Sequence, residues 1–409
     1  MSFAPSAVRR LTQTTKIMSN INDVFIVSAT RTPIGSFNGA LKKLTAPELG
    51  TFAVKAAIER ANLKPEHIED VYLGNVISGN VGQAPARQVV IASGCPETTE
   101  ATTINKVCAS GMKAISLAAQ NIMLGQRGIM VAGGMESMSN APYYIPRNST
   151  SGFGHGQLLD ALAKDGLTDV YNKFPMGNCA EKTAKDYSLS REDQDAYAIE
   201  SYKRAADAWK AGAFKDEIVP VVIADKKGSV TVDEDEEYKN VKLEKIPSLR
   251  PVFDAKGTVT AANASTINDG ASAVVLASEA EVKKHGLKPL AKIISFADAA
   301  CAPIDFPVAP AKAIPLALER AGLKKEDIAL WEINEAFSAV ALANNKILGL
   351  DASKVNTLGG GVSLGHPIGS SGCRIVVTLA HSLKPGEYGC AGVCNGGGGA
   401  SAIVIKREA

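Results

Sequence analysis

The stretch AIERANLKPEHIED at residues 57–70 recurs later in the chain as ALERAGLKKEDIAL at residues 317–330. Both copies have the apolar spacing of a helix, followed by a turn. Each is then followed by a short run typical of a strand, at residues 71–73 and 331–333. The sequence therefore predicts two copies of one α/β unit, in which helices cover a sheet.

The match between the copies extends to the starts of two further helices. The Ser-Gly pair at residues 110–111 corresponds to the Ser-Gly pair at residues 371–372, at nearly the same separation. Residues 138–267 lie between the copies and contain a strong helical pattern at residues 191–211, so we expect an inserted lid or loop domain. The predicted parts are an N-terminal half, the insertion and a C-terminal half, at residues 21–137 with 268–290, 138–267 and 291–409.

Length and composition indicate a large globular protein. The chain has 409 residues, which is enough for two or three domains around a sizeable core. Hydrophobic residues make up 45%, charged residues 21%, and the formal net charge is +2, so no basic surplus favours nucleic-acid binding. No apolar run approaches the roughly 18 residues of a membrane span. The seven cysteines have no CxxC spacing, which argues against a disulfide framework or a zinc ribbon.

The first 20 residues have the composition of a mitochondrial transit peptide. They contain Arg9, Arg10 and Lys16 together with several Ser and Thr, and they contain no acidic residue. A disordered tail is the alternative interpretation. A start at Met18 would remove the basic stretch and give a cytoplasmic form. We expect a mitochondrial protein.

Cys108 stands in the run NKVCASGMK at residues 105–113, where a strand-like stretch meets a helical one. The N–H groups and the dipole at a helix start stabilise a thiolate, so this placement predicts a nucleophilic thiol with a lowered pKa. Most free cysteines are buried and behave as small apolar residues. That interpretation holds for five others: Cys95, Cys179, Cys301, Cys373 and Cys390.

Two glycine-rich segments downstream offer a base and a second thiol. GHPIG at residues 365–369 contains His366, and CNGG at residues 394–397 begins with Cys394. A lone histidine is more often structural, and Asn395 before a run of glycines could be a plain turn. Together with Cys108, the two segments favour a catalytic set.

Four segments resemble the signature motifs of the thiolases. They are VCASGMKA at 107–114, NEAF at 334–337, GHPIGSSG at 365–372 and CNGGGGAS at 394–401. The resemblance covers the chain from residue 21 and is greatest to the acetoacetyl-CoA thiolases (acetyl-CoA C-acetyltransferases) of the mitochondrial, potassium-dependent type. It implies a five-layered αβαβα core built from two duplicated α/β halves, and assembly into a homotetramer.

The resemblance implies reversible Claisen condensation of two acetyl-CoA to acetoacetyl-CoA and CoA. Cys108 would carry the acetyl group, His366 would accept its thiol proton, and Cys394 would remove a proton from the second acetyl-CoA. His366 and a water held by Asn334 would stabilise the enolate oxygen, and the N–H groups of Cys108 and Gly396 would stabilise the tetrahedral intermediate. Outside its motif, Asn334 would more often be a helix cap.

Ligands are implied by the resemblance as well. CoA is substrate and product, and the positions matched to it are Ser265, Lys245, Met176 and Tyr202. A potassium ion is implied by the matching positions Tyr202, Ala261, Ala262, Ala264 and Val362. Residues 261–265 could equally be a plain loop. We expect no zinc, no redox cofactor, and no nucleic-acid or membrane partner.

Two positions bear on substrate range. Phe306 and Pro307 match a segment beside the acyl pocket, which implies tolerance of a 2-methyl group and 2-methylacetoacetyl-CoA as a further substrate. Many relatives have histidine where this chain has Pro175, so a hydrogen-bond donor is missing beside Met176 and the CoA contacts on that side are in question.

Other functions make different predictions. A ketoacyl synthase-like condensing enzyme obtains its carbanion by decarboxylation, so it would not need Cys394. A non-catalytic lipid-carrier relative would form no acyl-enzyme at Cys108. A dinucleotide-binding protein is disfavoured because the glycines at 359–365 lack the fingerprint that ends in an acidic residue.

Overall fold

The computed structural model describes residues 21–150, 153–225 and 228–409, so the predicted transit peptide lies outside the described residues. Within them, ten strands form one mixed sheet of order β14-β15-β16-β13-β1-β12-β5-β3-β4, with β2 paired to β12. β1 and β13 share only two residue pairs, so the sheet consists of two halves joined at a narrow seam. Its strands are β1 (Val24–Arg31), β2 (Gly35–Ser36), β3 (Asp70–Gly74), β4 (Glu100–Ile104), β5 (Ile129–Ser137), β12 (Asn268–Ser278), β13 (Ala291–Ala300), β14 (Ile328–Ile333), β15 (Tyr388–Asn395) and β16 (Gly399–Arg407).

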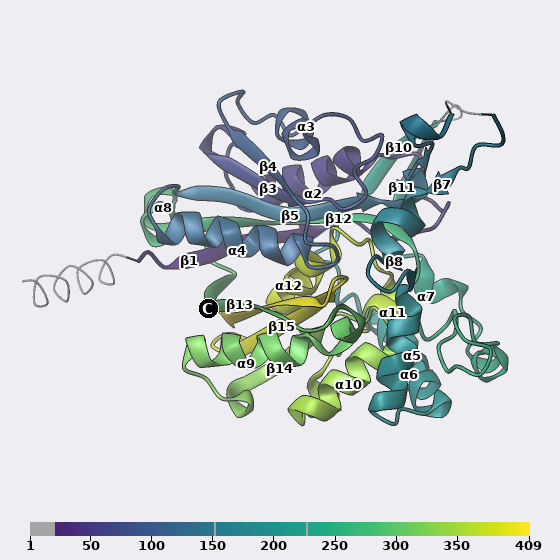
Figure 1. The fold of residues 1–409 in the computed structure, drawn as a ribbon. Helices are drawn as coiled ribbons and strands as arrows, with labels where there is room; N and C mark the ends of the chain where they lie inside the picture. The colour runs from purple at the N-terminus through teal and green to yellow at the C-terminus, as the bar shows by residue number, and fades with distance from the viewer. Residues whose placement is uncertain (1–20, 151–152, 226–227) are drawn as a thin grey trace, which may run out of the picture.

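The helices and the two half-sheets form five layers (Figure 1). α2 (Ala46–Arg60) packs on β12 and β5 with α3 (Pro85–Ala92) beside it, and α9 (Pro310–Ala321) packs on β13 and β16. α4 (Ser110–Met123) and α12 (Ser371–Ser382) fill the space between the half-sheets. Because α12 contacts β12 on one side and β14 and β15 on the other, the predicted αβαβα order is confirmed.

The internal repeat has the structure that its sequence predicts. In the first copy α2 is followed by the 3₁₀ turn Pro65–His67 and then by β3. In the second copy α9 is followed by the 3₁₀ turn Lys325–Asp327 and then by β14. Both strands lie in parallel pairs, β3 with β4 and β5, and β14 with β15. The two copies therefore occupy equivalent places in the two half-sheets.

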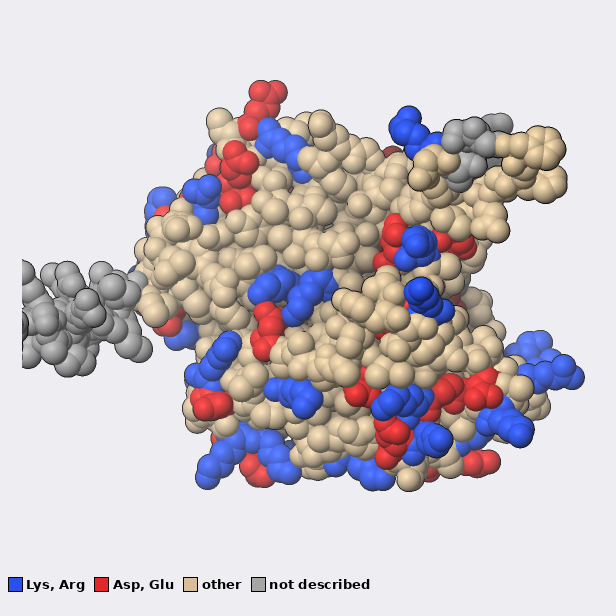
Figure 2. Space-filling model, in the orientation of Figure 1, with Lys and Arg blue, Asp and Glu red and all other residues tan. Residues whose placement is uncertain are grey.

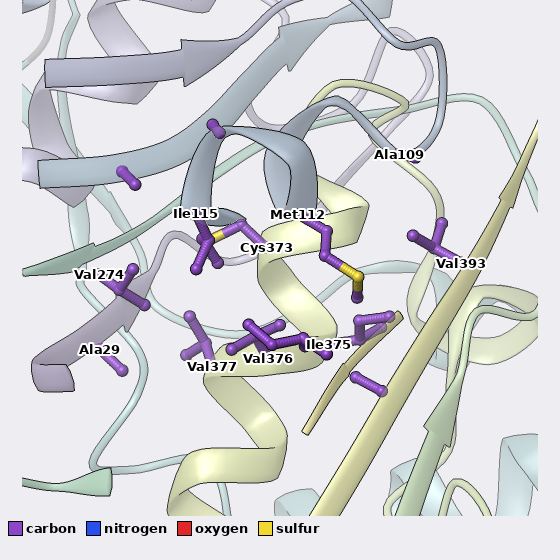
Figure 3. Close-up of a cluster of buried hydrophobic side chains, with 14 of the residues drawn as sticks. Ala29, Ala109, Met112, Ile115, Val274, Cys373, Ile375, Val376, Val377 and Val393 are labelled. Carbon is purple, nitrogen blue, oxygen red and sulfur yellow. The ribbon is translucent and has the colours of Figure 1, made fainter. Parts of the chain in front are cut away.

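The central helices cross in close contact at their first turns. A Cβ on Gly111 would lie 2.7 Å from the Cys373 nitrogen, and a Cβ on Gly372 would lie 2.8 Å from the Met112 nitrogen. These distances are too short for any side chain, so the crossing requires glycine on both helices. Beyond it, Met112 and Ile115 pack against α12 in a fully buried apolar cluster (Figure 3).

Residues 138–267, the predicted insertion and called the insertion below, form short ribbons and helices at one end of the layers (Figure 1). The predicted helix at 191–211 is confirmed as α6 (Arg191–Ala211), which Ser190 begins with a capping box. The strands and other α-helices described here are β6 (Tyr143–Tyr144), β7 (Leu159–Asp160), β8 (Thr168–Asp169), β9 (Phe174–Pro175), α5 (Met176–Asp186), β10 (Val221–Asp225), β11 (Gly228–Val232) and α7 (Glu237–Asn240). Elsewhere in the described residues, the remaining α-helices are α8 (Glu279–His285), α10 (Ser338–Leu348) and α11 (Gly361–Leu364).

A buried arginine ties the insertion to the sheet. Arg31, on β1, is fully buried and forms ion pairs with Glu217 and Asp235 of the insertion. Its Nη1 and Nη2 donate to the two oxygens of Asp235 at 2.8 and 3.0 Å, and Trp209 Nε1 donates to the same carboxylate at 3.0 Å. The guanidinium also lies over the Phe214 ring. This network fixes how the insertion sits on the layers.

The surface has no region of one charge on the face shown in Figure 2, where acidic and basic side chains are mixed. This agrees with the formal net charge of +2. Within the described part of the chain, no helix is both long and apolar enough to cross a bilayer.

Candidate active site

Cys108 lies on a tight turn between β4 and α4. The Ser110 hydroxyl holds this turn, donating to the Val107 carbonyl (2.6 Å) and accepting from the Lys106 N–H (2.8 Å). Val107 has a φ of +48°, which a β-branched residue seldom adopts, so the backbone is strained next to the thiol. The turn leaves Cys108 8% exposed, on the wall of a cavity.

The expected low pKa of the Cys108 thiol is wrong for this structure. Burial raises the pKa to about 12, because a thiolate in apolar surroundings loses its hydration. The N–H groups of Gly396 and of Cys108 itself lower the pKa, but by less than burial raises it. Cys108 is therefore a protonated thiol at neutral pH and needs a base to act as a nucleophile.

His366 lies between α11 and α12 and is held on two sides. Its Nδ1 is 2.6 Å from the Ser371 hydroxyl, and its main-chain N–H donates to Asn268 Oδ1 at 2.8 Å. The Ser371 hydroxyl donates its single proton to the Pro367 carbonyl (2.9 Å), so it accepts from Nδ1–H. Nε2 is then the unprotonated nitrogen, and it has no hydrogen-bond partner among the described residues.

The imidazole is also held neutral. Burial, and to a smaller extent the nearby Arg374 guanidinium, lower the pKa of His366 to about 4. At physiological pH the ring is therefore uncharged, with a lone pair available on Nε2. A neutral imidazole facing the same cavity as a protonated thiol can act as the base that activates it.

Cys108 and His366 open on one cavity of about 660 Å³. Gly396 contributes backbone to its wall, where a Cβ would lie 3.5 Å from Met176 Cε. The remaining lining is largely apolar and includes Met138, Leu162, Leu167, Phe253, Phe306, Phe337 and Ile368. A cavity of this size and character suits a small organic substrate.

Cys394 and Asn334 are not among the residues that line this cavity. Cys394, near the end of β15, is fully buried, and burial together with the Cys108 thiol holds its pKa well above the usual range. Asn334 follows β14, and neither its Nδ2 nor its Oδ1 has a partner among the described residues. Buried amides are nearly always hydrogen-bonded, so the Asn334 side chain fits a site for an ordered water.

The predicted ligand-binding residues lie at two neighbouring cavities. Met176 and Ser265 line the main cavity, as does Pro175. A second cavity of about 310 Å³ is lined by Tyr202 and Lys245. The two cavities share four lining residues: Glu237, Asn240, Ala261 and Thr266. The predicted ligand-binding residues of the two cavities therefore lie next to each other.

The predicted potassium ligands gather around the second cavity. Tyr202, Ala261 and Ala262 line it, Val362 packs with Tyr202 and Ala262, and Ala264 lines the main cavity. The Tyr202 pKa is raised by burial and by two nearby carboxylates, Glu237 and Glu335.

The Glu335 carboxylate is buried without an ion-pair partner among the described residues, and it accepts hydrogen bonds from Tyr197 (2.8 Å), Ser201 (2.8 Å), Asn356 (3.0 Å) and Val362 (3.1 Å). A buried carboxylate that lacks a positive partner fits a cation bound nearby.

Sequence reasoning missed several residues of this site. Glu335 stands inside the NEAF motif, and Ser371 was visible as a marker of the repeat, so both had a signal that could have been followed. Asn268 had none, because it is far from His366 in sequence and they meet only in the fold.

Two family models match the chain over nearly its whole described length. The thiolase N-terminal domain matches residues 24–280, and the thiolase C-terminal domain matches residues 287–407. The chain belongs to the thiolase family. The fold and the order of the four motifs agree with that assignment.

Curated relatives and solved structures of thiolases are similar to the chain over most of its length. The mitochondrial acetyl-CoA acetyltransferase of Rattus norvegicus is 60% identical over 389 residues, covering 95% of this chain and 92% of the relative. The acetyl-CoA acetyltransferase of Yarrowia lipolytica is 60% identical over 390 residues, covering 95% of this chain and 98% of the relative. A thiolase from Ascaris suum in complex with coenzyme A has a TM-score of 0.91 at 56% identity, and the match covers 94% of this chain and 100% of that structure. Human mitochondrial 3-ketoacyl-CoA thiolase has a TM-score of 0.91 at 41% identity, and the match covers 95% of this chain and 100% of that structure.

Ser371→Ala tests the assignment of the His366 tautomer in this thiolase. Without the acceptor at Nδ1, the proton can move to Nε2, and we expect alkylation of Cys108 by iodoacetamide at pH 7 to slow on the order of 10-fold. Peptide mass spectrometry measures the rate. Ser382→Ala, on the same helix but bonded to the Thr378 carbonyl, is the control that keeps the wild-type rate. An unchanged rate in Ser371→Ala would contradict the assignment.

Proposed function

We propose that this thiolase is an acetyl-CoA C-acetyltransferase, which joins two acetyl-CoA into acetoacetyl-CoA and CoA through an acetyl group on Cys108 and runs reversibly. The observation that carries the proposal is that Cys108 and His366, whose Nε2 has no partner among the described residues, line one largely apolar cavity. The names of the curated relatives support the acetyl-transfer activity, and the coenzyme A complex of the Ascaris suum thiolase supports CoA as substrate and product.

In the first step His366 Nε2 accepts the proton of the Cys108 thiol, and the sulfur attacks the carbonyl carbon of acetyl-CoA. The N–H groups of Cys108 and Gly396 would stabilise the oxyanion, since both act on the thiolate in the free protein. The bond from carbon to the CoA sulfur then breaks. Cys394 donates its proton to the leaving sulfur and remains as a thiolate.

In the second step the Cys394 thiolate removes a methyl proton from another acetyl-CoA. Its raised pKa makes it a strong base once it is ionised, as a carbon acid requires. The enolate oxygen would be stabilised by His366, now protonated at Nε2, and by a water on Asn334. The enolate attacks the acetyl group, the bond to Cys108 breaks, and the Cys108 sulfur takes back the proton from His366.

CoA would enter along both cavities. Met176 and Ser265 would contact it in the main cavity, and Lys245 and Tyr202 in the second one. Pro175 also lines the main cavity and offers no N–H donor. Phe306 on the cavity wall supports 2-methylacetoacetyl-CoA as a further substrate.

Potassium would be held by the Tyr202 hydroxyl and by the carbonyls of Ala261, Ala262, Ala264 and Val362. When bound, the ion would supply a positive charge that neutralises the buried Glu335. That charge would order the segment at residues 261–266, which lines both cavities.

Two further proposals concern assembly and location. Several exposed apolar side chains at residues 143–171 support a homotetramer, because exposed apolar surface favours self-association: Tyr143, Ile145, Leu158, Val170 and Tyr171. The basic first 20 residues and the mitochondrial names of several relatives support a mitochondrial location.

A CoA-dependent cleavage assay of acetoacetyl-CoA, run in potassium and in sodium, tests the proposal. Wild-type protein should release acetyl-CoA, several-fold faster with potassium, because the cation orders residues that line both cavities. Cys108→Ser should be inactive, and Cys95→Ser, a buried cysteine outside the cavity, should match wild type. Absence of cleavage by wild type would refute the proposal, and equal rates in both salts would refute the role of potassium.

A further inference from the structure

Glu136 is a buried carboxylate at the end of β5 that the mechanism above does not use. It is fully buried and has no ion-pair partner among the described residues. Four donors from two loops satisfy it instead. Oε1 accepts from Asn75 Nδ2 (2.8 Å) and the Ile77 N–H (3.2 Å), and Oε2 accepts from the Val76 N–H (3.0 Å) and the Gly369 N–H (2.9 Å).

One of these loops carries His366. Gly369 is three residues after His366, and its carbonyl is packed against the backbones of two strands and one helix. A Cβ on Gly134 would lie 2.0 Å from the Gly369 oxygen, and a Cβ on Gly74 would lie 2.6 Å from it. The loop that carries His366, from the C-terminal half, therefore packs against the N-terminal half. The Glu136 carboxylate accepts a hydrogen bond from the Gly369 N–H of this loop.

The other loop leads to Cys108. The Val76 carbonyl accepts from Asn105 Nδ2 at 3.3 Å, and Asn105 Oδ1 accepts from the Val107 N–H at 3.0 Å. Val107 is the strained residue directly before the nucleophile. Glu136 therefore stands between the two catalytic loops, with Gly369 on one side and the chain of Val76, Asn105 and Val107 on the other.

We propose that Glu136 is a positioning residue that sets the separation of His366 from Cys108 by holding both of their loops on one carboxylate. The inference goes together with the proposed function, because it explains how a base from one half of the chain meets a nucleophile from the other. A misplacement of about 1 Å between reacting groups can cost on the order of 100-fold in rate. A carboxylate with four acceptor positions can hold two loops, which a neutral side chain of the same size cannot.

The ionisation of Glu136 predicts a measurable pH dependence. The pKa of Glu136 is raised to about 7: burial raises it most, the backbone N–H donors lower it, and Asp269 on β12 raises it. Above pH 7 the carboxylate can accept all four hydrogen bonds; below pH 7 one oxygen carries a proton and opposes its donors. The other titratable group that Glu136 acts on is Cys108. Because the pKa of His366 is about 4, the imidazole does not titrate in this range.

The test measures the rate at which iodoacetamide alkylates Cys108 between pH 6 and 8, beside acetylation of Cys108 by acetyl-CoA. Glu136→Asp keeps the charge but withdraws the carboxylate by one methylene, so we expect both rates to fall at least 10-fold. Glu136→Gln removes the titration, so the inflection expected near pH 7 in wild type should disappear. Asp70→Asn, a buried carboxylate at the opposite end of the adjacent strand β3, should keep the wild-type rates and inflection.

The outcomes separate positioning from a purely structural role. If both Glu136 variants unfold at lower temperature but are alkylated with the wild-type rate and pH profile, the proposal is overturned. If Glu136→Gln does not fold, the rates of Cys108 alkylation and acetylation in Glu136→Asp alone decide whether the proposal holds. Failure of wild type to become acetylated would refute the acetyltransferase function, whereas the alkylation results would still decide the role of Glu136.

Discussion

Cys394→Ala should lower the rate of CoA-dependent acetoacetyl-CoA cleavage by about 1,000-fold, within the range typical for loss of a general acid or base. The reason is that the proposed mechanism assigns the proton of the substrate carbon to Cys394, and His366, protonated at that stage, cannot act as a base in its place. Alkylation of Cys108 by iodoacetamide should keep its wild-type rate, because the pairing of Cys108 with His366 is unaffected. The cleavage assay and peptide mass spectrometry on the same preparation measure both.

Cys390→Ala is the matched control for this experiment. Cys390 lies on the same strand β15 and is equally buried, and it lines neither cavity. It should lose some stability from a smaller core side chain but keep its activity. Full activity in Cys394→Ala would contradict the role of Cys394 as the acid and base of the proposed mechanism.

Arg31→Met should lower the free energy of unfolding by about 3–5 kcal/mol, the usual effect of breaking a buried ion-pair network from one side. Methionine nearly fills the volume but leaves the Glu217 and Asp235 carboxylates buried without a counter-charge. For a chain of this length, that loss corresponds to a fall of about 5 °C in the unfolding midpoint. Differential scanning calorimetry measures the midpoint.

Two controls separate charge from packing in the Arg31 experiment. Lys292→Met breaks an exposed pair with Asp23 and should change stability by less than about 0.5 kcal/mol. The triple variant Arg31→Met, Glu217→Gln, Asp235→Asn removes all three charges and should recover part of the loss. If Arg31→Met alone unfolds like wild type, the network does not anchor the insertion.

Local and repeated signals made the architecture predictable from sequence. The duplicated stretch at residues 57–70 and 317–330 gave the two equivalent units, and helix α6 was visible from its periodicity. The strand-to-helix junction identified Cys108 and the glycine-rich segment at residues 365–369 identified His366, and the fold brings both to one cavity. These features depend on residues close together in the chain, where spacing carries the information.

What the sequence could not predict depends on burial and on distant contacts. The pKa of Cys108 was expected to be low from the helix start, but the desolvation that raises it comes from the packed layers around it. Arg31 meets Asp235 and Glu217 only when the insertion folds back. Glu136 likewise gains its partners from remote loops. Such groups carry no local pattern that distinguishes them from surface charges.

The close crossing of α4 and α12 at Gly111 and Gly372 suggests a history for the molecule. Because each glycine fills the same role on its own helix, the crossing has the symmetry of two identical subunits meeting face to face. An ancestral single unit could therefore have paired with a copy of itself through this helix. In the present chain the two sides of this crossing differ in chemistry, because the first half supplies the Cys108 thiol and the second half supplies the His366 imidazole.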